Sequence, residues 1–243
     1  MCVDKNMTFN GKVALVAGGT GGLGRAVSLG FLSEGATVIV TYLVDQEFAE
    51  LKREADANSS RLAGVHVDVT DETAVQQGVE EILAGHQRLD VLVNTVGGYA
   101  GGMKLWESDV RTFDRMLALN LRSGFVLTRA AAKVMLPQRK GAIVNVAAKA
   151  GLDHAPGLAV YAASKAAAVA LIDSLAADLK GTGVRVNSIL PSVIDTEANR
   201  KAMPGADFTK WPKPEDVARV ILFLCSDDAK VVHGASIPVY GNS

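Results

Sequence analysis

The sequence has only two cysteines, Cys2 and Cys225, and they lie near opposite ends of the chain. Two cysteines so far apart match no metal-binding or disulfide spacing. Their scarcity excludes a disulfide-stapled domain and a thiolate metal centre, and it is typical of a reducing compartment. We expect both side chains to be free thiols, and we expect no metal ion.

An excess of either charge is also missing. The 25 basic and 26 acidic residues are interspersed and give a net charge of −1. Nucleic acids and anionic membrane surfaces are bound through basic patches, so this balance excludes both partners on electrostatic grounds. A small molecule is the expected partner.

Long hydrophobic runs are absent as well. No stretch reaches the roughly 18 apolar residues that a membrane span needs. Residues Met1 to Asn10 include Asp4 and Lys5 and lack the apolar segment of a signal peptide. The sequence therefore predicts a cytoplasmic protein.

The sequence does contain short apolar runs, bounded by glycines, that alternate with longer segments of helical period. This alternation predicts an α/β fold, a Rossmann-type doubly wound parallel sheet of about seven strands with helices on both faces. One domain is expected over residues 1–243. Strands are expected over Val13–Ala17, Thr37–Thr41, Gly64–Val67, Val91–Asn94, Ala142–Val146, Val184–Leu190 and Ile237–Val239. Helices are expected over Gly22–Glu34, Asp45–Ala57, Asp71–Ala84, Val110–Leu136, Val160–Leu179 and Pro214–Ser226.

One segment, at about residues 196–212, has no clear period. It follows the carboxyl end of a predicted strand, where open α/β sheets bind ligands. We interpret it as a substrate lid.

A glycine-rich turn, Ala17-Gly18-Gly19-Thr20-Gly21-Gly22-Leu23-Gly24, joins the first predicted strand to the first helix. Missing Cβ atoms let backbone amides approach a pyrophosphate at a helix N-terminus. The turn predicts a dinucleotide site, and the alternative is a tight strand-to-helix connection without a ligand. The predicted contacts are Gly18, Gly19, Gly21, Gly22, Leu23 and Gly24.

Tyr161 and Lys165 lie four residues apart in Tyr-Ala-Ala-Ser-Lys, so they share one helix face. An ammonium beside a phenol would hold the pKa of Tyr161 down and make it a usable proton donor. The alternative is a core ring next to a solvated amine.

These motifs together resemble the short-chain dehydrogenase/reductase family, from about Gly11 to Gly241. The resemblance rests on the glycine turn, Asp68-Val69, Asn94-Thr95-Val96-Gly97, Asn120 in Leu-Asn-Leu, Tyr161 to Lys165, Arg185-Val186-Asn187 and Pro214 to Ala218. It implies an NAD(P)-dependent oxidoreductase with Tyr161, Lys165 and Asn120 as catalytic residues, the last through a relay to Lys165. Further cofactor contacts implied are Asp68, Val69, Asn94, Gly97, Lys165, Pro191, Ile194 and Thr196.

Family members usually have a serine thirteen residues before the tyrosine, where this chain has Ala148. Ser164 is close in sequence but is expected to point elsewhere on the helix. The quinonoid dihydropteridine reductases have alanine there, and three stretches are similar to theirs: Gly97 to Gly102, Ala147 to Gly157 and Leu190 to Trp211. Their substrate is already electron-poor, so little oxyanion stabilisation is required.

Several side chains are candidate substrate contacts: Tyr99, Ala148, Phe208 and Trp211. Tyr99 could stack on a flat heterocycle and Trp211 could close over it. The alternatives are a loop aromatic packed on its own glycines and a helix-entry anchor. His154 is interpreted as structural or solvated.

The acid that would bind a ribose diol at the end of the second strand is replaced by Tyr42. Repulsion of a 2′-phosphate is thereby relieved, and Thr41 and Tyr42 could donate to such a phosphate. The predicted cofactor is NAD(P)H, with NADP slightly favoured.

The leading hypothesis is an NAD(P)H-dependent reductase of a preactivated conjugated substrate such as a quinonoid dihydropterin. The alternative is a 3-oxoacyl or general carbonyl reductase. A different class is a catalytically weak nucleotide-binding sensor. A homodimer or homotetramer is expected in each case.

Overall fold

The computed structural model describes residues 8–242, so Cys2 lies outside the described residues. Its centre is a seven-stranded sheet in the order β3-β2-β1-β4-β5-β6-β7, with every neighbouring pair parallel. The predicted doubly wound α/β fold is confirmed. The strands are β1 (Val13–Ala17), β2 (Thr37–Tyr42), β3 (Leu62–His66), β4 (Val91–Asn94), β5 (Gly141–Val146), β6 (Val184–Pro191) and β7 (Ser236–Val239).

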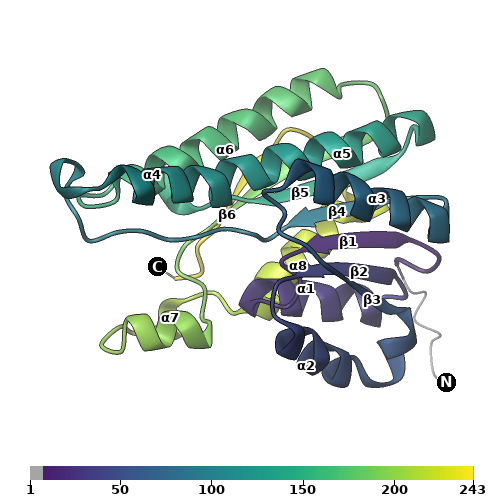
Figure 1. Ribbon diagram of the computed structural model, residues 1–243, viewed down its shortest axis with the longest axis horizontal. Coiled ribbons are helices and arrows are strands. Elements are labelled where there is room, and N and C mark those ends of the chain that lie inside the picture. Colours follow the sequence, from purple (N-terminus) through teal and green to yellow (C-terminus); the bar gives the residue numbers. More distant parts are fainter. Residues whose placement is uncertain (1–7, 243) are drawn as a thin grey trace.

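Helices cover both faces of the sheet (Figure 1). One face carries α1 (Gly22–Ser33), α2 (Asp45–Ala55) and α8 (Pro214–Cys225), whose apolar side chains form one core with the strands. The other face carries α3 (Glu72–His86), α5 (Ser123–Gln138) and α6 (Ala159–Asp178), which form a second core. α4 (Val110–Leu117) packs beside α6. Strands buried on both faces explain the continuous Val, Ile and Leu runs.

The structure corrects the predicted long helix Val110–Leu136. It divides into α4 and α5, and between them Ala118–Arg122 form a π-helical turn. Such single turns are often found at functional sites, because the extra residue redirects nearby side chains. Here the turn contains the buried Asn120.

The segment 196–212 is also more ordered than its lack of period indicated. It contains the short helix α7 (Glu197–Ala202), which begins at a Thr196 cap, and a 3₁₀ turn at Phe208–Lys210. α7 projects away from the layer formed by α4, α5 and α6 (Figure 1).

Helix α6 is long and apolar enough to cross a membrane by length and composition alone. A buried core helix passes the same test, and α6 packs against β6 and α4. Cys225, the described cysteine, is buried at the end of α8, and burial raises the pKa of its thiol to about 12.

Candidate active site

The glycine turn between β1 and α1 has no room for side chains at several positions. A Cβ on Gly24 would overlap the carbonyl oxygen of Gly18, and a Cβ on Gly22 would lie 2.8 Å from Thr196 Cγ2. Gly18 has a φ of +70°, which favours glycine. α1 begins after Gly21 without a side-chain cap, which leaves its first amides to an anion. The turn therefore fits the pyrophosphate of a dinucleotide.

Hydrogen bonds to β2, to α2 and to the segment after β4 hold this turn in place. Thr95 Oγ1 donates to the carbonyl oxygen of Ala17 at 2.7 Å, and Thr20 Oγ1 donates to Glu47 Oε2 at 2.8 Å. The Gly18 amide donates to Thr41 Oγ1 at 3.0 Å. Thr41 is buried and accepts this bond, so its own hydroxyl proton is not used in it, and its donation to a phosphate stays a prediction.

The other residues predicted around the adenosine differ in what they can offer. Tyr42 is stacked on Phe48, with ring centroids 4.7 Å apart, and its half-buried ring ends β2. Asp68 is exposed, and its carboxylate accepts hydrogen bonds from the amide and hydroxyl of Thr70. Leu23 and Val69 are buried in the two cores, so only their backbone atoms could contact a cofactor.

The ends of β4 and β5 meet beside the turn. Asn94 Nδ2 donates to Asn145 Oδ1 at 2.9 Å across the two strands, while Asn94 Oδ1 accepts from the Val96 amide. These bonds set the backbone that leads to Gly97. A Cβ on Gly97 would lie 2.9 Å from Asn120 Oδ1 and 3.0 Å from Lys165 Nζ. Gly97 thus leaves open the place where two predicted catalytic side chains converge.

Asn120 is clamped to the segment after β4. Its Oδ1 accepts from the Gly98 amide at 2.9 Å, and its Nδ2 donates to the Gly98 carbonyl at 3.0 Å and to Ser164 Oγ at 2.9 Å. Ser164 Oγ in turn donates to the Tyr161 carbonyl at 2.7 Å. The expectation that Ser164 turns away from the substrate side is confirmed.

The structure overturns the expected pKa of the phenol. Lys165 Nζ donates to the Val146 carbonyl at 3.2 Å, and no hydrogen bond joins it to Tyr161 among the described residues. Burial, with a smaller contribution from the charge of Tyr99, raises the pKa of Tyr161 to about 12. Burial lowers the pKa of Lys165 to about 8. Spacing placed the two residues on one helix, but burial decides the pKa of each of them.

Tyr99 contacts Tyr161 directly. The ring centroids are 5.0 Å apart and the planes meet at 68°, an edge-to-face arrangement. Tyr99 is 65% exposed, so most of its ring remains open to a ligand. Ala148, in extended backbone after β5, is buried and has no hydroxyl to offer.

The predicted lid begins at the cofactor side of the site. Pro191 ends β6 and is buried, Ile194 packs against the first core, and Thr196 lies against Gly22. Thr196 Oγ1 accepts from the Asn199 amide as the cap of α7.

The two lid aromatics are brought together, but away from Tyr161. The rings of Phe208 and Trp211 lie 5.0 Å apart, and the Arg200 guanidinium lies 5.0 Å from the Phe208 ring. Among the described residues neither ring contacts Tyr99 or Tyr161. Their role as substrate contacts stays a prediction.

The carboxyl end of the chain is attached to this lid. The Asn242 amide donates to the Lys210 carbonyl at 3.0 Å, and a Cβ on Gly241 would lie 2.9 Å from the same oxygen. The Lys149 ammonium lies over the Tyr240 ring, 4.9 Å from its centroid, and Lys149 follows Ala148 in the sequence. The C-terminal residues therefore connect the lid to the loop after β5.

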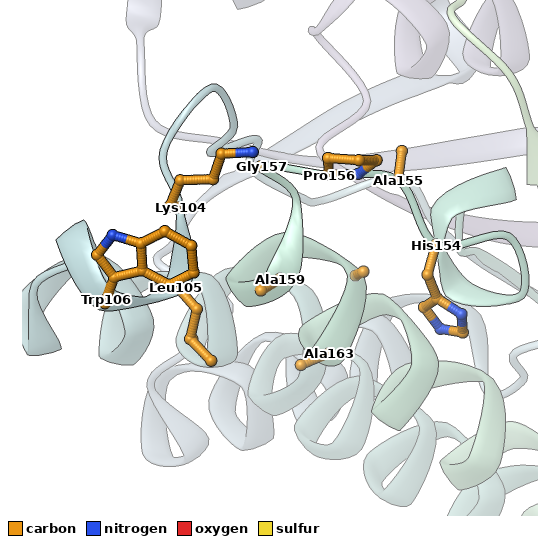
Figure 2. A pocket seen from close by; sticks show the side chains of 10 residues that line it. Lys104, Leu105, Trp106, His154, Ala155, Pro156, Gly157, Ala159 and Ala163 are labelled. Carbon is orange, nitrogen blue, oxygen red and sulfur yellow. The ribbon is translucent and has the colours of Figure 1, made fainter.

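His154 is exposed and lines a cavity of about 550 Å³ together with Trp106, Pro156, Ala159 and Ala163 (Figure 2). Ala159 and Ala163 each lie two residues from Tyr161, which is about 200° around the helix. These two alanines therefore lie on the side of α6 away from Tyr161, while Ala162, next to Tyr161, also lines the cavity. His154 is exposed, which agrees with a solvated side chain.

Comparisons with known proteins agree with this geometry. Residues 12–207 match the family model described as short chain dehydrogenase. The chain belongs to the short-chain dehydrogenase family. It is an NAD(P)-dependent oxidoreductase of that family, and the predicted enzyme class and cofactor type are confirmed.

Its relatives in the short-chain dehydrogenase family align over nearly the whole chain. The 3-oxoacyl-(acyl-carrier-protein) reductase of Thermotoga maritima is 34% identical over 245 residues, which cover 97% of this chain and 98% of that protein. The meso-2,3-butanediol dehydrogenase of Serratia marcescens is 35% identical and covers 98% and 96%. The solved structure of ElxO with NADP bound has a TM-score of 0.89 and 27% identity, with coverage of 95% and 97%.

Sequence reasoning missed three features of the site. The Thr20 to Glu47 bond, the Val146 acceptor for Lys165 and the Tyr99 to Tyr161 contact each join residues from separate elements. Only the last had a signal in the sequence, namely an aromatic residue flanked by glycines just after the fourth strand.

Proposed function

We propose that the protein interconverts a carbonyl compound and the corresponding secondary alcohol, with NAD(P)H as the hydride donor in the reductive direction. The observation that carries the proposal is the convergence of Lys165 and Asn120 on Gly97, beside a glycine turn fitted to a pyrophosphate, with Tyr161 one turn before Lys165 on α6. The names of the two curated relatives, a 3-oxoacyl reductase and a diol dehydrogenase, support this reading over a pterin substrate.

The chain's own residues would hold and move the proton. Tyr161 stays protonated over the whole physiological range, because burial raises its pKa to about 12. Its Oη can therefore donate a proton to the carbonyl oxygen as that oxygen gains charge. A bound nicotinamide supplies the hydride that goes to the carbonyl carbon. Lys165, charged below about pH 8, stabilises the phenolate that remains.

Substrate comparison tests the proposal. Oxidation of NADH and of NADPH is followed with a 3-oxoacyl thioester, an acyloin, a cyclic ketone and a quinonoid dihydropterin, and the reverse reaction with a vicinal diol. We expect at least one carbonyl or diol to be turned over and Tyr161→Phe to lower that rate about 10²-fold. Turnover of the pterin alone would contradict the proposal.

The second candidate is the quinonoid dihydropterin reductase. Two observations favour it: Ala148 offers no hydroxyl to a developing alkoxide, and the exposed Tyr99 ring could stack on a flat heterocycle. In that case the pterin would be the best substrate of the comparison, and Tyr99→Leu would raise its KM.

We also propose that the chain forms a homodimer or homotetramer in the cytoplasm. A groove of about 500 Å³ on α4, α5 and α6 is lined by Leu117, Leu121, Phe125 and Leu171, with Asp114 and Arg122 at hand. Opposite charges on one apolar face suit a two-fold contact with a second copy.

Sedimentation would test the assembly with matched variants. Phe125→Glu, at a side chain 45% exposed in the groove, should yield monomers from a dimer and dimers from a tetramer. Phe223→Glu, at a side chain 48% exposed on α8 across the sheet, should leave the assembly intact. Equal effects of both changes would contradict the proposal, and recovery of the protein in a membrane fraction would contradict the location.

A further inference from the structure

The reducing reaction proposed above leaves one electrostatic need that Tyr161 alone does not meet. A carbonyl oxygen that accepts hydride at its carbon develops negative charge, and removing one of its hydrogen-bond donors typically costs about 10² to 10³ in rate. Tyr161 provides one donor. Position 148, at the end of β5, provides none because it is alanine.

Three other hydroxyls around the site already donate to backbone carbonyls. Ser164 Oγ donates to the Tyr161 carbonyl at 2.7 Å. Ser192 Oγ donates to the Tyr240 carbonyl at 2.8 Å. Thr95 Oγ1 donates to the Ala17 carbonyl at 2.7 Å. None of these three protons is directed at a substrate beside Tyr161.

Tyr99 is different. Its ring touches the Tyr161 ring edge to face at 5.0 Å, it is 65% exposed, and the described residues give its hydroxyl no hydrogen-bond partner. A phenol that is solvent-exposed in the free protein loses little when it exchanges water for a substrate oxygen. The hydroxyl is therefore available for a ligand.

The backbone around Tyr99 is held from both sides. Gly98, just before it, exchanges two hydrogen bonds with the Asn120 amide group at 2.9 and 3.0 Å. Gly102, three residues after it, donates to the Gly157 carbonyl at 3.0 Å. An aromatic side chain between two such attachments has little freedom beyond its own rotation, which is what a preorganised donor requires.

Gly101 completes the arrangement. A Cβ at this position would collide with the Tyr99 hydroxyl oxygen and would lie 2.6 Å from Leu158 Cδ2. The absent side chain is what allows the phenol to lie over the loop next to Tyr161.

We propose that the Tyr99 hydroxyl is a second hydrogen-bond donor to the substrate's carbonyl oxygen, beside Tyr161. Tyr99 is then a catalytic residue, and its ring serves mainly to place the hydroxyl. The bond strengthens as the oxygen gains charge and weakens again when the proton from Tyr161 arrives. The inference rests on the proposed carbonyl reductase function.

The test uses Tyr99→Phe, which removes the hydroxyl and keeps the ring against Tyr161. With the best carbonyl substrate we expect kcat to fall about 10²-fold, and Tyr99→Phe/Ala148→Ser to recover at least tenfold of it, since a serine at 148 restores a hydroxyl. The dissociation constant of NAD(P)H, measured by fluorescence, should stay within twofold. An unchanged kcat in Tyr99→Phe, or a loss that the added serine does not recover, would overturn the inference.

A binding measurement separates this inference from the proposed function. Isobutyramide is an unreactive amide whose oxygen mimics the carbonyl, and its affinity for the full-length protein with NAD(P)H is measured by fluorescence quenching. We expect Tyr99→Phe to weaken it about tenfold, which corresponds to one hydrogen bond, and the added Ala148→Ser to restore it. If the amide affinities change in this way but no carbonyl compound is turned over, the proposed reaction is rejected and the role of Tyr99 as a hydrogen-bond donor stands. If wild type and both variants bind the amide equally well, the role of Tyr99 as a donor is rejected.

Discussion

The Lys165 ammonium donates a hydrogen bond to the backbone oxygen of Val146, at 3.2 Å, and to no side chain among the described residues. The amine is buried, and this carbonyl together with the open space over Gly97 defines its surroundings. α6 is thereby joined to the end of β5. Burial lowers the pKa of Lys165 to about 8, so the loss of its charge should be visible in the pH dependence of the reaction.

The pH dependence of carbonyl reduction should report Lys165. Burial lowers its pKa to about 8, so the side chain is charged below that pH and neutral above it. Tyr161, with a pKa of about 12, remains protonated across this range. We expect kcat/KM to be level below about pH 8 and to fall above it. Lys165→Met should give a low rate without this limb, and a wild-type rate that rises above pH 8 would contradict the assignment.

The glycine turn offers a matched pair of substitutions. Gly24→Ala puts a Cβ inside the contact distance of the Gly18 carbonyl oxygen and should cost about 2 kcal/mol of stability. Gly21→Ala places its Cβ at 3.6 Å from the same oxygen, an ordinary contact. Thermal melts and NAD(P)H fluorescence titrations should show a destabilised, non-binding Gly24→Ala protein and a stable Gly21→Ala protein. Equal stability of the two variants would show that the turn is looser than the structure indicates.

Asn120 should matter for stability as well as for catalysis. Asn120→Ala removes two hydrogen bonds to Gly98, one to Ser164 and a weak one to Met116 Sδ, and should cost about 2 to 3 kcal/mol in urea unfolding. Ser164→Ala removes the bond to Asn120 and the one to the Tyr161 carbonyl, and a cost of about 1 to 2 kcal/mol is expected. A larger loss of stability in Ser164→Ala than in Asn120→Ala would mean that Asn120 does not hold the loop that carries Tyr99.

Asp90 should make the fold sensitive to acid. Burial pushes the pKa of its carboxyl up, but hydrogen bonds from Arg88 and the Val13 amide and the charge of Lys12 outweigh it, so the pKa lies below the usual value. The stabilisation of the folded state by the Asp90 carboxylate is present above its unfolded-state pKa of about 3.9, and it is lost as the pH falls through its folded-state pKa.

Asp90→Asn should therefore cost about 2 kcal/mol at pH 7 in urea unfolding, and its difference from wild type should shrink below pH 4. Asp216→Asn breaks only the exposed pair with Arg219 and should cost less than about 0.5 kcal/mol. A difference at Asp90 that grows toward low pH would have the wrong sign for a carboxylate stabilised in the fold.

The order of elements could be predicted because it depends on local signals. β1 and β4 have the predicted bounds, and α1 begins at the predicted Gly22. Apolar runs and the glycine turn are short-range patterns, so they can be recognised in the sequence without knowledge of the packing. The third strand was predicted two residues too late, because Leu62 is buried while the strand's later residues are partly exposed.

The fine geometry of the site could not be predicted, because distant residues determine it. The π turn contains Asn120, whose side chain bonds to Gly98 and Ser164, and both partners come from other parts of the chain. The raised pKa of Tyr161 depends on burial and on where Lys165 finds its acceptor, nineteen positions away in the chain. Neither the π turn nor the raised pKa of Tyr161 can be inferred from residue spacing alone.

The Asn242 amide donates to the Lys210 carbonyl, which ties the end of the described chain to the segment that we predict to be a lid. A purification tag fused beyond this point would load that bond, so kinetic constants should be compared between the tagged and the untagged protein. Trimming the same end would remove one tie on the segment without changing any predicted ligand contact.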